Sequence, residues 1–230
     1  MRAHSEWLGT MNLGALLFDL DGTLADTDPV HLQAWIECLR PHGVEIDRKY
    51  YRSRISGRLS SIVARNLLPD LNDEALNEVV RLKQSLFCEL GAKLSKLKGL
   101  DKLLEWSRSK GLRLGLVTNA TRFHVQFMLS KLGLKGFFDT EVLGEELPAG
   151  KPDPAPYRIA VSQLKIEPQF GLAFEDSPSG IRSAVAAGVK TIGIASSQTP
   201  HQLLCAGAFL VINDFCNQQL WELLEGNKYQ

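Results

Sequence analysis

The sequence predicts an α/β protein in which a parallel sheet carries helices on both faces and an all-helical unit is inserted after the first strand. The short apolar run Ala15–Phe18 is typical of a buried parallel strand. Residues 29–98 show only helical periodicity. From Gly99 onward, apolar segments of strand length alternate with segments of helical period, which is the pattern of a parallel sheet.

Length and composition are those of an ordinary globular protein. The chain has 230 residues, of which 44% are hydrophobic and 23% charged, and its formal net charge is zero. This balance gives no reason to expect nucleic acid or an acidic membrane surface as a partner. No stretch approaches the ~20 apolar residues of a membrane span, and the N-terminal residues do not resemble a secretory signal. The cysteines lack metal-ligand spacing, so we expect free thiols and a cytoplasmic protein; they are Cys38, Cys88, Cys205 and Cys216.

The first elements are predicted from capping residues and apolar spacing. Residues 1–12 carry no periodic pattern and should form a loose lead-in to the first strand. A helix is predicted from Pro29, with Asp28 as its N-cap and Pro29 in the first helical position. This helix should end near residues 41–43. Its apolar face is formed by Leu32, Trp35, Ile36 and Leu39.

The rest of the inserted unit is predicted to be helical after one polar interruption. Residues 48–58 are basic and polar, and two more helices should follow them. The second of these carries an apolar stripe that consists of Leu76, Val79, Val80, Leu86, Phe87 and Leu90. We therefore predict a core of residues 13–28 and 99–230 and a helical unit of residues 29–98.

Strands and helices alternate through the remainder of the chain. The predicted strands comprise residues 112–117, Thr140–Leu143, 172–174, 189–194 and 208–212. Helices are predicted over Leu100–Ser109, between Val125 and Leu132, and after the prolines at 152, 154 and 156. A further helix should begin at Ser177-Pro178 and end at Gly188, because serine favours the N-cap, proline fits the first turn and glycine ends helices.

Four short segments place polar groups at strand ends or in loops on one side of the predicted sheet. They are Asp19-Leu20-Asp21-Gly22-Thr23-Leu24, Thr118-Asn119, Gly150-Lys151-Pro152-Asp153-Pro154 and Glu175-Asp176. Each has a simpler interpretation alone: turn residues for the first and last segments, a helix cap for Thr118-Asn119 and a solvated loop lysine for Lys151. Ligands bind beyond the carboxyl ends of the strands in open α/β sheets, so the joint placement favours a binding site.

Convergence of these loops would bring four carboxylates into a small volume. Two like charges about 4 Å apart repel by about 4 kcal/mol at an effective dielectric constant of about 20, so the cluster would need a cation. Oxygen ligands without neighbouring histidine or cysteine favour Mg²⁺ over zinc. The Thr118 hydroxyl, backbone N–H groups and the Lys151 ammonium group would suit the other oxygens of a phosphate. The pattern therefore predicts a phosphoryl group bound beside Mg²⁺.

The four segments, in this order and with Ser177-Pro178-Ser179-Gly180 after the last, resemble the motifs of the haloacid dehalogenase-like superfamily. The resemblance extends from about Gly14 to Gly193. It is greatest to the branch of phosphatases and β-phosphoglucomutases, whose helical cap is inserted after the first motif. It implies a Rossmann-like core, a mobile cap and Mg²⁺-dependent phosphoryl transfer from a small phosphomonoester, such as a sugar phosphate, through an aspartyl-phosphate.

The resemblance implies a role for each motif residue. Asp19 would be the nucleophile and a metal ligand. Asp21 would be the general acid and base, and its backbone carbonyl would also bind the metal. Asp176 would be the third metal ligand, with Glu175 orienting the waters on the metal. The residues assigned to the phosphoryl group are Thr118, Asn119 and Lys151.

The resemblance also covers the cap, which should determine the substrate. The basic stretch of residues 48–58 corresponds to a substrate-specificity loop, with Arg54, Gly57 and Arg58 as candidate substrate contacts, although a solvated linker is the simpler interpretation. His31 aligns with a histidine that assists the acid/base aspartate in β-phosphoglucomutases. Thr27 lies in the expected hinge between core and cap.

The sequence favours hydrolysis over phosphosugar mutase activity. Ser56 stands where β-phosphoglucomutases have a lysine, and Ser60 falls near the place of their phosphate-binding arginine. Arg54 or Arg58 could substitute for these cations. A dehalogenase would not need the second aspartate, and a non-catalytic binding protein should have lost a motif residue, so both are weaker alternatives. The sequence identifies neither the substrate nor the oligomeric state.

Overall fold

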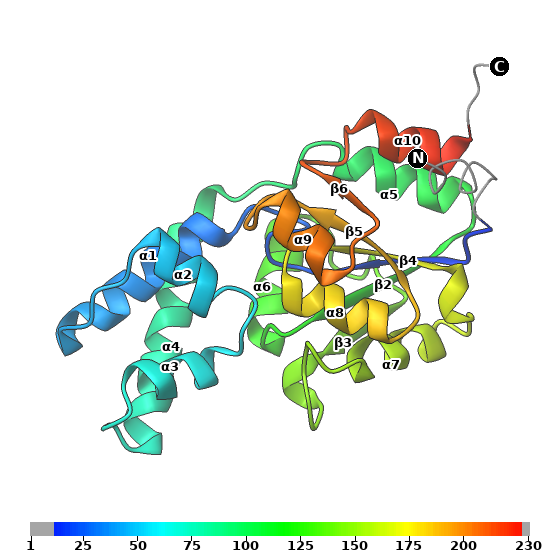
Figure 1. The fold of residues 1–230 in the computed structure, drawn as a ribbon. Coiled ribbons are helices and arrows are strands. Elements are labelled where there is room, and N and C mark those ends of the chain that lie inside the picture. Colours follow the sequence, from blue (N-terminus) through cyan, green and yellow to red (C-terminus); the bar gives the residue numbers. More distant parts are fainter. Residues whose placement is uncertain (1–11, 227–230) are drawn as a thin grey trace.

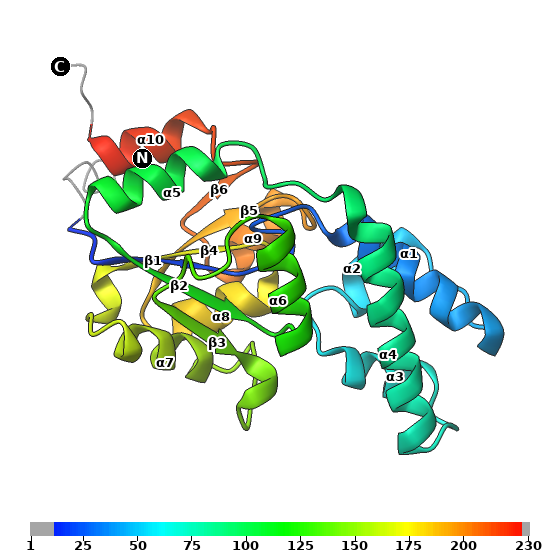
Figure 2. The ribbon, with the colours of Figure 1, turned by 180° about the vertical axis from the view of Figure 1, so that it is seen from behind.

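The computed structural model describes residues 12–226, so the expected lead-in lies outside the described residues apart from Asn12. These residues form a six-stranded sheet with helices on both faces and, beside one edge of the sheet, a group of four helices (Figure 1). Figure 2 shows the same arrangement from behind. Within residues 12–226, no helix combines the length and the hydrophobicity that crossing a bilayer requires.

The sheet is parallel throughout and has the strand order β3-β2-β1-β4-β5-β6. β1 lies in its interior, where Leu16 pairs with Leu114 of β2 and with Leu172 of β4. The predicted α/β class and Rossmann-like core are confirmed. The strands are β1 (Ala15–Phe18), β2 (Arg113–Thr118), β3 (Thr140–Leu143), β4 (Gly171–Glu175), β5 (Lys190–Ile194) and β6 (Leu210–Ile212).

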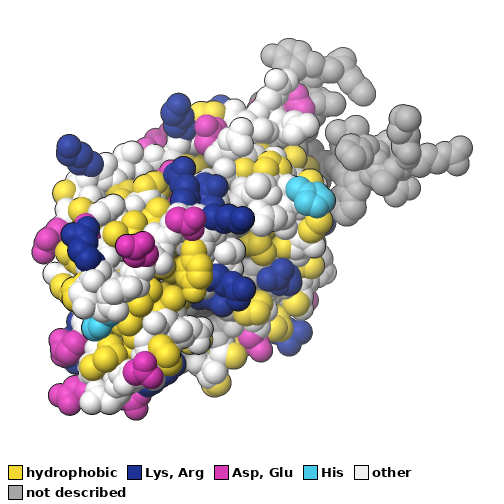
Figure 3. Space-filling view, turned by 60° about the vertical axis from the view of Figure 1, so that its left-hand side comes forward, with side chains coloured by type: hydrophobic (Ala, Val, Ile, Leu, Met, Phe, Trp, Pro, Cys, Tyr) yellow, Lys and Arg dark blue, Asp and Glu magenta, His cyan; other side chains and the backbone are white. Residues whose placement is uncertain are grey.

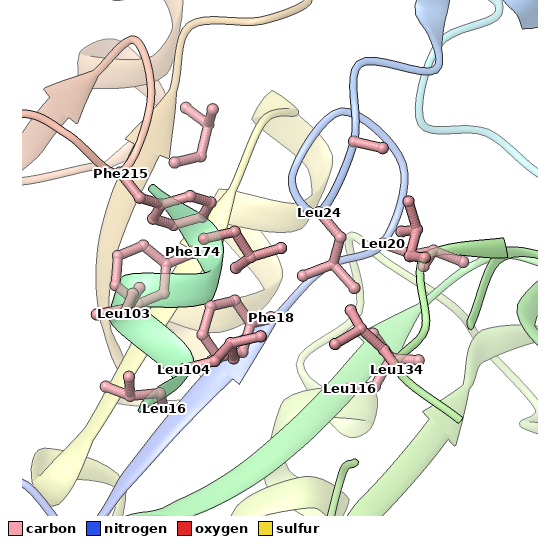
Figure 4. Packing of buried hydrophobic residues seen from close by; sticks show 14 of the residues in the cluster. Leu16, Phe18, Leu20, Leu24, Leu103, Leu104, Leu116, Leu134, Phe174 and Phe215 are labelled. Carbon is pink, nitrogen blue, oxygen red and sulfur yellow. The ribbon is translucent and has the colours of Figure 1, made fainter. Parts of the chain in front are cut away.

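Alternating side chains of β1 divide the core into two layers. Leu16 and Phe18 pack on one face with α5 (Leu100–Ser109), α6 (Arg122–Lys131) and α10 (Gln218–Glu225). Ala15 and Leu17 pack on the other with α7 (Ala155–Gln163) and α8 (Pro178–Ala186), and α9 (Pro200–Ala206) packs against α8. Figure 4 shows the first layer, where the ring of Phe18 stacks on that of Phe174 at 5.1 Å between centroids. Both faces are buried, so the strand is apolar throughout rather than alternating.

The four helices beside the sheet share a hydrophobic cluster of their own, which includes Trp35, Leu39, Tyr51 and Val79. We call this group the helical bundle. It consists of α1 (Asp28–Leu39), α2 (Arg48–Arg54), α3 (Ser60–Leu67) and α4 (Asp73–Leu90). On the face shown in Figure 3, acidic and basic side chains are interspersed with apolar ones. Between these elements, the described residues also form short 3₁₀ helices: η1 (Arg40–His42), η2 (Gly91–Lys93), η3 (Gly144–Glu146) and η4 (Pro168–Phe170).

Part of the basic stretch forms helix α2, which the sequence pattern does not predict. The Asp47 carboxylate accepts a hydrogen bond from the backbone N–H of Tyr50 at 2.6 Å and so caps this helix. Tyr51 and Ile55, four residues apart, are buried in the bundle. One cap and one apolar pair are too little for a periodic signal.

Other predicted element ends also differ from the structure. Asp28 is not the N-cap of α1, because it lies inside the helix and Thr27 is the N-cap. The Asp28 carboxylate instead accepts a hydrogen bond from the Tyr51 hydroxyl at 3.1 Å. Helices α9 and α10 are absent from the prediction, although Thr199 and Gln202 form a capping box at the start of α9. These helices have seven and eight residues, which is shorter than the window over which helical periodicity is judged.

We expect Phe18→Ala to lower the free energy of unfolding by about 3–5 kcal/mol, because its ring is fully buried between the sheet and the helices. The matched control is Phe209→Ala, the same change at a side chain that is 44% exposed, which should cost about 1 kcal/mol or less. Urea denaturation measures both values. Equal losses would contradict the central place of β1 in the core.

Candidate active site

The turn after β1 presents Asp19 and Asp21 at the carboxyl edge of the sheet. The backbone N–H of Asp19 donates to the carbonyl oxygen of Phe174 at 3.0 Å, which extends the pairing of β1 with β4. Gly22 has a φ of 76°, and a Cβ atom there would clash with the carboxylate of Asp176. Glycine therefore lets the turn pass close to Asp176, and the first and last predicted segments meet.

The ammonium group of Lys151 lies at the centre of this cluster. Its Nζ donates to Oδ1 of Asp19 at 2.6 Å and to Oε1 of Glu175 at 2.5 Å. A third hydrogen bond, of 2.6 Å, goes to the carbonyl oxygen of Val117. Only 3% of the Lys151 side chain is exposed, so the interpretation as a solvated loop lysine is wrong.

Burial makes the negative charges of this cluster costly. Burial raises the pKa of Asp19 to about 7 despite the opposing charge of Lys151. The pKa of Asp176 is raised well above its ordinary value by burial and by the charges of Asp19 and Glu175. One ammonium group does not compensate three buried carboxylates, so a further cation would stabilise the site.

The carboxylate oxygens lie close enough to one another to bind one cation jointly. One oxygen each from Asp19, Glu175 and Asp176 lies within 4.8 Å of the others. The Glu175 carboxylate already accepts hydrogen bonds from Lys151, from the Tyr157 hydroxyl at 2.8 Å and from the Ser177 hydroxyl at 3.3 Å. Asp19 and Asp176 are therefore the better candidates for direct contact with a metal. An all-oxygen donor set of this kind fits Mg²⁺.

Thr118 and Asn119 lie at the same edge, at the end of β2. The Asn119 amide binds the backbone of Lys151 twice: Oδ1 accepts from its N–H at 2.9 Å, and Nδ2 donates to its carbonyl oxygen at 3.1 Å. Asn119 thus holds the loop that carries the lysine. The buried Thr118 accepts from the N–H of Ala120. Thr121 caps α6, so the interpretation of Thr118-Asn119 as a helix cap is wrong.

A cavity of about 420 Å³ lies between this edge of the sheet and the helical bundle. Arg54 does not line this cavity but a separate surface hollow of about 250 Å³, which it shares with Arg58. Thr27 is buried, and its hydroxyl has no hydrogen-bond partner within residues 12–226. The predicted site residues that do line the cavity are Asp19, Asp21, Thr118, Asn119, Lys151 and Asp176 from the core and His31, Gly57 and Arg58 from the bundle side.

Residues 16–194 match the family described as haloacid dehalogenase-like hydrolase. The chain belongs to this family. It is 31% identical over 209 residues to the phosphorylated carbohydrates phosphatase of Thermotoga maritima, which covers 86% of this chain and 93% of that relative. It is 29% identical over 196 residues to the validoxylamine A 7′-phosphate phosphatase of Streptomyces hygroscopicus, with coverages of 84% and 91%.

Solved structures agree with this assignment. The fold is similar to the crystal structure of a CbbY variant from Rhodobacter sphaeroides in complex with xylulose-(1,5)bisphosphate. The TM-score is 0.78 at 27% identity, and the match covers 89% of this chain and 96% of that one. The resemblance inferred from the motifs is confirmed, and the haloacid dehalogenase-like hydrolase described here is a phosphoric monoester hydrolase.

In this hydrolase the Asp21 carboxylate lies against two imidazole rings. Its Oδ1 is 3.1 Å from Nε2 of His31 and 2.9 Å from Nε2 of His124. The Nδ1 atom of His31 is in turn 2.8 Å from Nζ of Lys83. An ammonium group can only donate, so Nδ1 of His31 accepts and its Nε2–H donates to Asp21.

These contacts decide the charge states around Asp21. Burial and the charge of Lys83 lower the pKa of His31 to about 3, so its ring is neutral. Burial lowers the pKa of Lys83 to about 8. Burial alone would raise the pKa of Asp21, but the two histidines hold it well below its ordinary value. A phosphate dianion in the cavity would raise the pKa of Asp21.

The sequence prediction names His31 but misses Lys83 and His124. Lys83 occupies the apolar stripe of α4, four residues after Val79 and four before Phe87, and it is buried. A charged residue in that stripe was an available signal. His124 gave no such signal, because its proximity to Asp21, 103 residues earlier, arises only from the fold.

The bundle also contacts the core directly around the cavity. A Cβ on Gly57, whose φ is 74°, would lie 3.1 Å from the Ser179 hydroxyl oxygen, so the loop after α2 lies on the N-terminus of α8. Gln84 of α4 donates to the Thr121 hydroxyl. Nε2 of Gln198 donates to the carbonyl oxygen of Arg52 at 3.1 Å. These contacts join the bundle to the core around the cavity.

Asp28, which lines the cavity, should make the stability of the protein depend on pH. Burial raises its pKa to about 6, above the unfolded value, so the folded state holds this proton more tightly. The stabilisation that protonated Asp28 contributes to the free energy of unfolding is present below about pH 4. It is lost as the pH rises through about 6, a change of at most about 3 kcal/mol. Asp28→Asn should therefore gain stability relative to the parent between pH 5 and pH 8.

Thermal denaturation at both pH values, in the presence of a chelator, measures this gain. Asp70→Asn, the same change at an exposed position, is the control and should show no such trend. A parent and an Asp28→Asn variant whose stabilities stay parallel from pH 5 to pH 8 would contradict the raised pKa.

Proposed function

We propose that this hydrolase is a Mg²⁺-dependent phosphatase that releases phosphate from a small phosphomonoester, a sugar phosphate, through an aspartyl-phosphate on Asp19. The observation that carries the proposal is the position of the Asp19 carboxylate at the carboxyl end of an interior strand. Lys151 binds one of its oxygens, Oδ1, and the other has no hydrogen bond within residues 12–226. The free oxygen is available for attack on phosphorus.

The donor set supports Mg²⁺ as the cofactor. The carboxylates of Asp19 and Asp176 and the backbone carbonyl of Asp21 would hold the ion, with Glu175 orienting its waters. When bound, the ion would offset the charge of the acidic cluster and of the phosphoryl oxygens. Lys151 and Thr118 would contact the remaining phosphoryl oxygens.

Two displacements account for hydrolysis. In the first, an Asp19 oxygen bonds to phosphorus, the bond from phosphorus to the substrate oxygen breaks, and Asp21 gives its proton to the departing oxygen. In the second, water bonds to phosphorus and loses a proton to Asp21, and the bond from phosphorus to Asp19 breaks. The products are the alcohol and inorganic phosphate, and both aspartates return to their initial states.

A sugar phosphate is supported by the relatives and by the lining of the cavity. One relative is named for phosphorylated carbohydrates, and a CbbY structure contains a sugar bisphosphate. The bundle side of the cavity offers hydrogen-bonding groups of Ser56, Arg58, Ser60 and Gln84, which could bind sugar hydroxyls. We further propose that residues 29–98 act as a cap hinged near Thr27, whose closure excludes water from the phosphoryl group.

Phosphate release from p-nitrophenyl phosphate should require both Mg²⁺ and Asp19. We expect Asp19→Asn, which keeps the shape of the side chain but weakens the nucleophile, to lose at least about 10³-fold in kcat. Excess chelator should abolish turnover of the parent, and added Mg²⁺ should restore it. Asp153→Asn, at an exposed carboxylate in the Lys151 loop, is the control and should stay near the parent rate. Full turnover by Asp19→Asn would contradict the aspartyl-phosphate.

Hydrolysis should also prevail over transfer to a second sugar oxygen. A mutase needs a cap cation that holds the distal phosphate, because the sugar hydroxyl must outcompete water for the phosphorylated Asp19. Arg54 lies outside the cavity, and Ser56 and Ser60 offer no charge. Of the bundle cations that line the cavity, Lys83 is bound to His31, which leaves Arg58. With β-glucose 1-phosphate and a trace of the bisphosphate, we expect free phosphate to appear faster than glucose 6-phosphate. The reverse order would support the mutase alternative.

A further inference from the structure

The two oxygens of the Asp21 carboxylate have different surroundings. Oδ1 accepts hydrogen bonds from both imidazole rings, whereas Oδ2 has no hydrogen-bond partner within residues 12–226. The side chain is 27% exposed and lines the cavity. Oδ2 is therefore the oxygen that can exchange a proton with a substrate or a water, and the contacts at Oδ1 fix its direction.

The two imidazoles belong to different parts of the molecule. His31 lies on α1 of the bundle, which would leave Asp21 if the cap moved away from the core. His124 lies on α6, which packs on the same sheet that carries Asp21. It is the core-side contact of the pair, because its backbone belongs to the same unit as Asp21 even though Phe87 of α4 packs on its ring.

His124 is also held firmly in place. Its backbone N–H donates to the hydroxyl of the N-cap residue Thr121 at 3.2 Å, which fixes the first turn of α6. The ring of Phe87 packs against the imidazole at 4.5 Å between centroids. Only 4% of His124 is exposed. A ring with so little freedom directs its Nε2 to one place, the Asp21 carboxylate.

We propose that His124 is a positioning residue that holds Asp21 for proton transfer from the core side. Its Nε2–H donates to Oδ1 and keeps Oδ2 turned into the cavity, whether or not His31 is in contact. His124 does not touch the substrate, and it acts only through Asp21. The inference rests on the proposed function, because it takes Asp21 to be the proton carrier.

The same three side chains could in principle ligate a transition metal, since their donor atoms lie within 4.8 Å of one another. The hydrogen bond from Lys83 opposes this. With the ammonium group 2.8 Å from Nδ1 of His31, the proton of this neutral ring sits on Nε2, which therefore has no lone pair to offer a metal. The network favours two donors on one carboxylate over a metal centre.

The test uses substituted phenyl phosphates with Mg²⁺, from p-nitrophenyl to phenyl phosphate. Phenolate is the poorer leaving group and needs the proton more. The variants are His124→Gln, whose Nε2–H can replace the imidazole donor, and His124→Met, of the same length without a donor. We expect His124→Met to lose about 10- to 100-fold on phenyl phosphate and much less on p-nitrophenyl phosphate. His124→Gln should remain within about threefold of the parent on both.

The Asp21→Asn background separates positioning from a merely structural role. Removing the proton carrier should remove the effect, so Asp21→Asn with His124→Met should be no slower than Asp21→Asn alone. Equal losses on all substrates, or the same further loss in the Asp21→Asn background, would overturn the role of His124. If Asp21→Asn itself showed no dependence on the leaving group, the assignment of Asp21 under the proposed function would fail instead. Thermal denaturation of each variant checks that the fold is intact.

Discussion

The buried ammonium group of Lys151, which binds Asp19 and Glu175 together, is the interaction on which the site depends. These carboxylates terminate neighbouring strands, β1 and β4, and without a cation between them their repulsion would act in a largely buried region, where water screens charge poorly. Asn119 fixes the backbone of this lysine and thereby ties the end of β2 to the same point. Three strand ends thus meet around one charge. Loss of that charge would leave a buried cluster of carboxylates. Either the strand ends would then separate or a carboxylate would take up a proton.

Asp19 and Asp21, two residues apart, have opposite surroundings. Asp19 is buried beside other carboxylates, and its pKa is raised, whereas Asp21 accepts two imidazole hydrogen bonds and its pKa is lowered. The difference arises because the two side chains point in different directions. Asp19 points toward Glu175 and Asp176, and Asp21 points toward α1 and α6. In the proposed mechanism the first forms a bond to phosphorus and the second carries a proton. The same short turn thereby supports two chemical roles.

The elements that the sequence predicts well are those with long or redundant signals. The strand Ala15–Phe18 and the helix Leu100–Ser109 have the predicted bounds, because the first is apolar throughout and the second has clear apolar periodicity. Helices α2, α9 and α10 are missed, since each is short and stabilised by a side-chain cap and by packing. The N-cap of α1 is misplaced by one residue, because Asp28 forms a hydrogen bond with Tyr51, 23 residues away.

The sequence by itself determined the fold class, the family and the residues at the sheet edge, because strand ends and motif spacing are local properties of the chain. The tertiary structure decided which groups meet across long separations. It pairs Lys151 with Asp19, 132 residues earlier, and it leaves Arg54 outside the cavity while Arg58 lines it. Lys83 and His124 join the site for the same reason. Their contacts depend on how α4 and α6 pack around Phe87, and side-chain distances of this kind are set by packing in three dimensions rather than by any spacing along the chain.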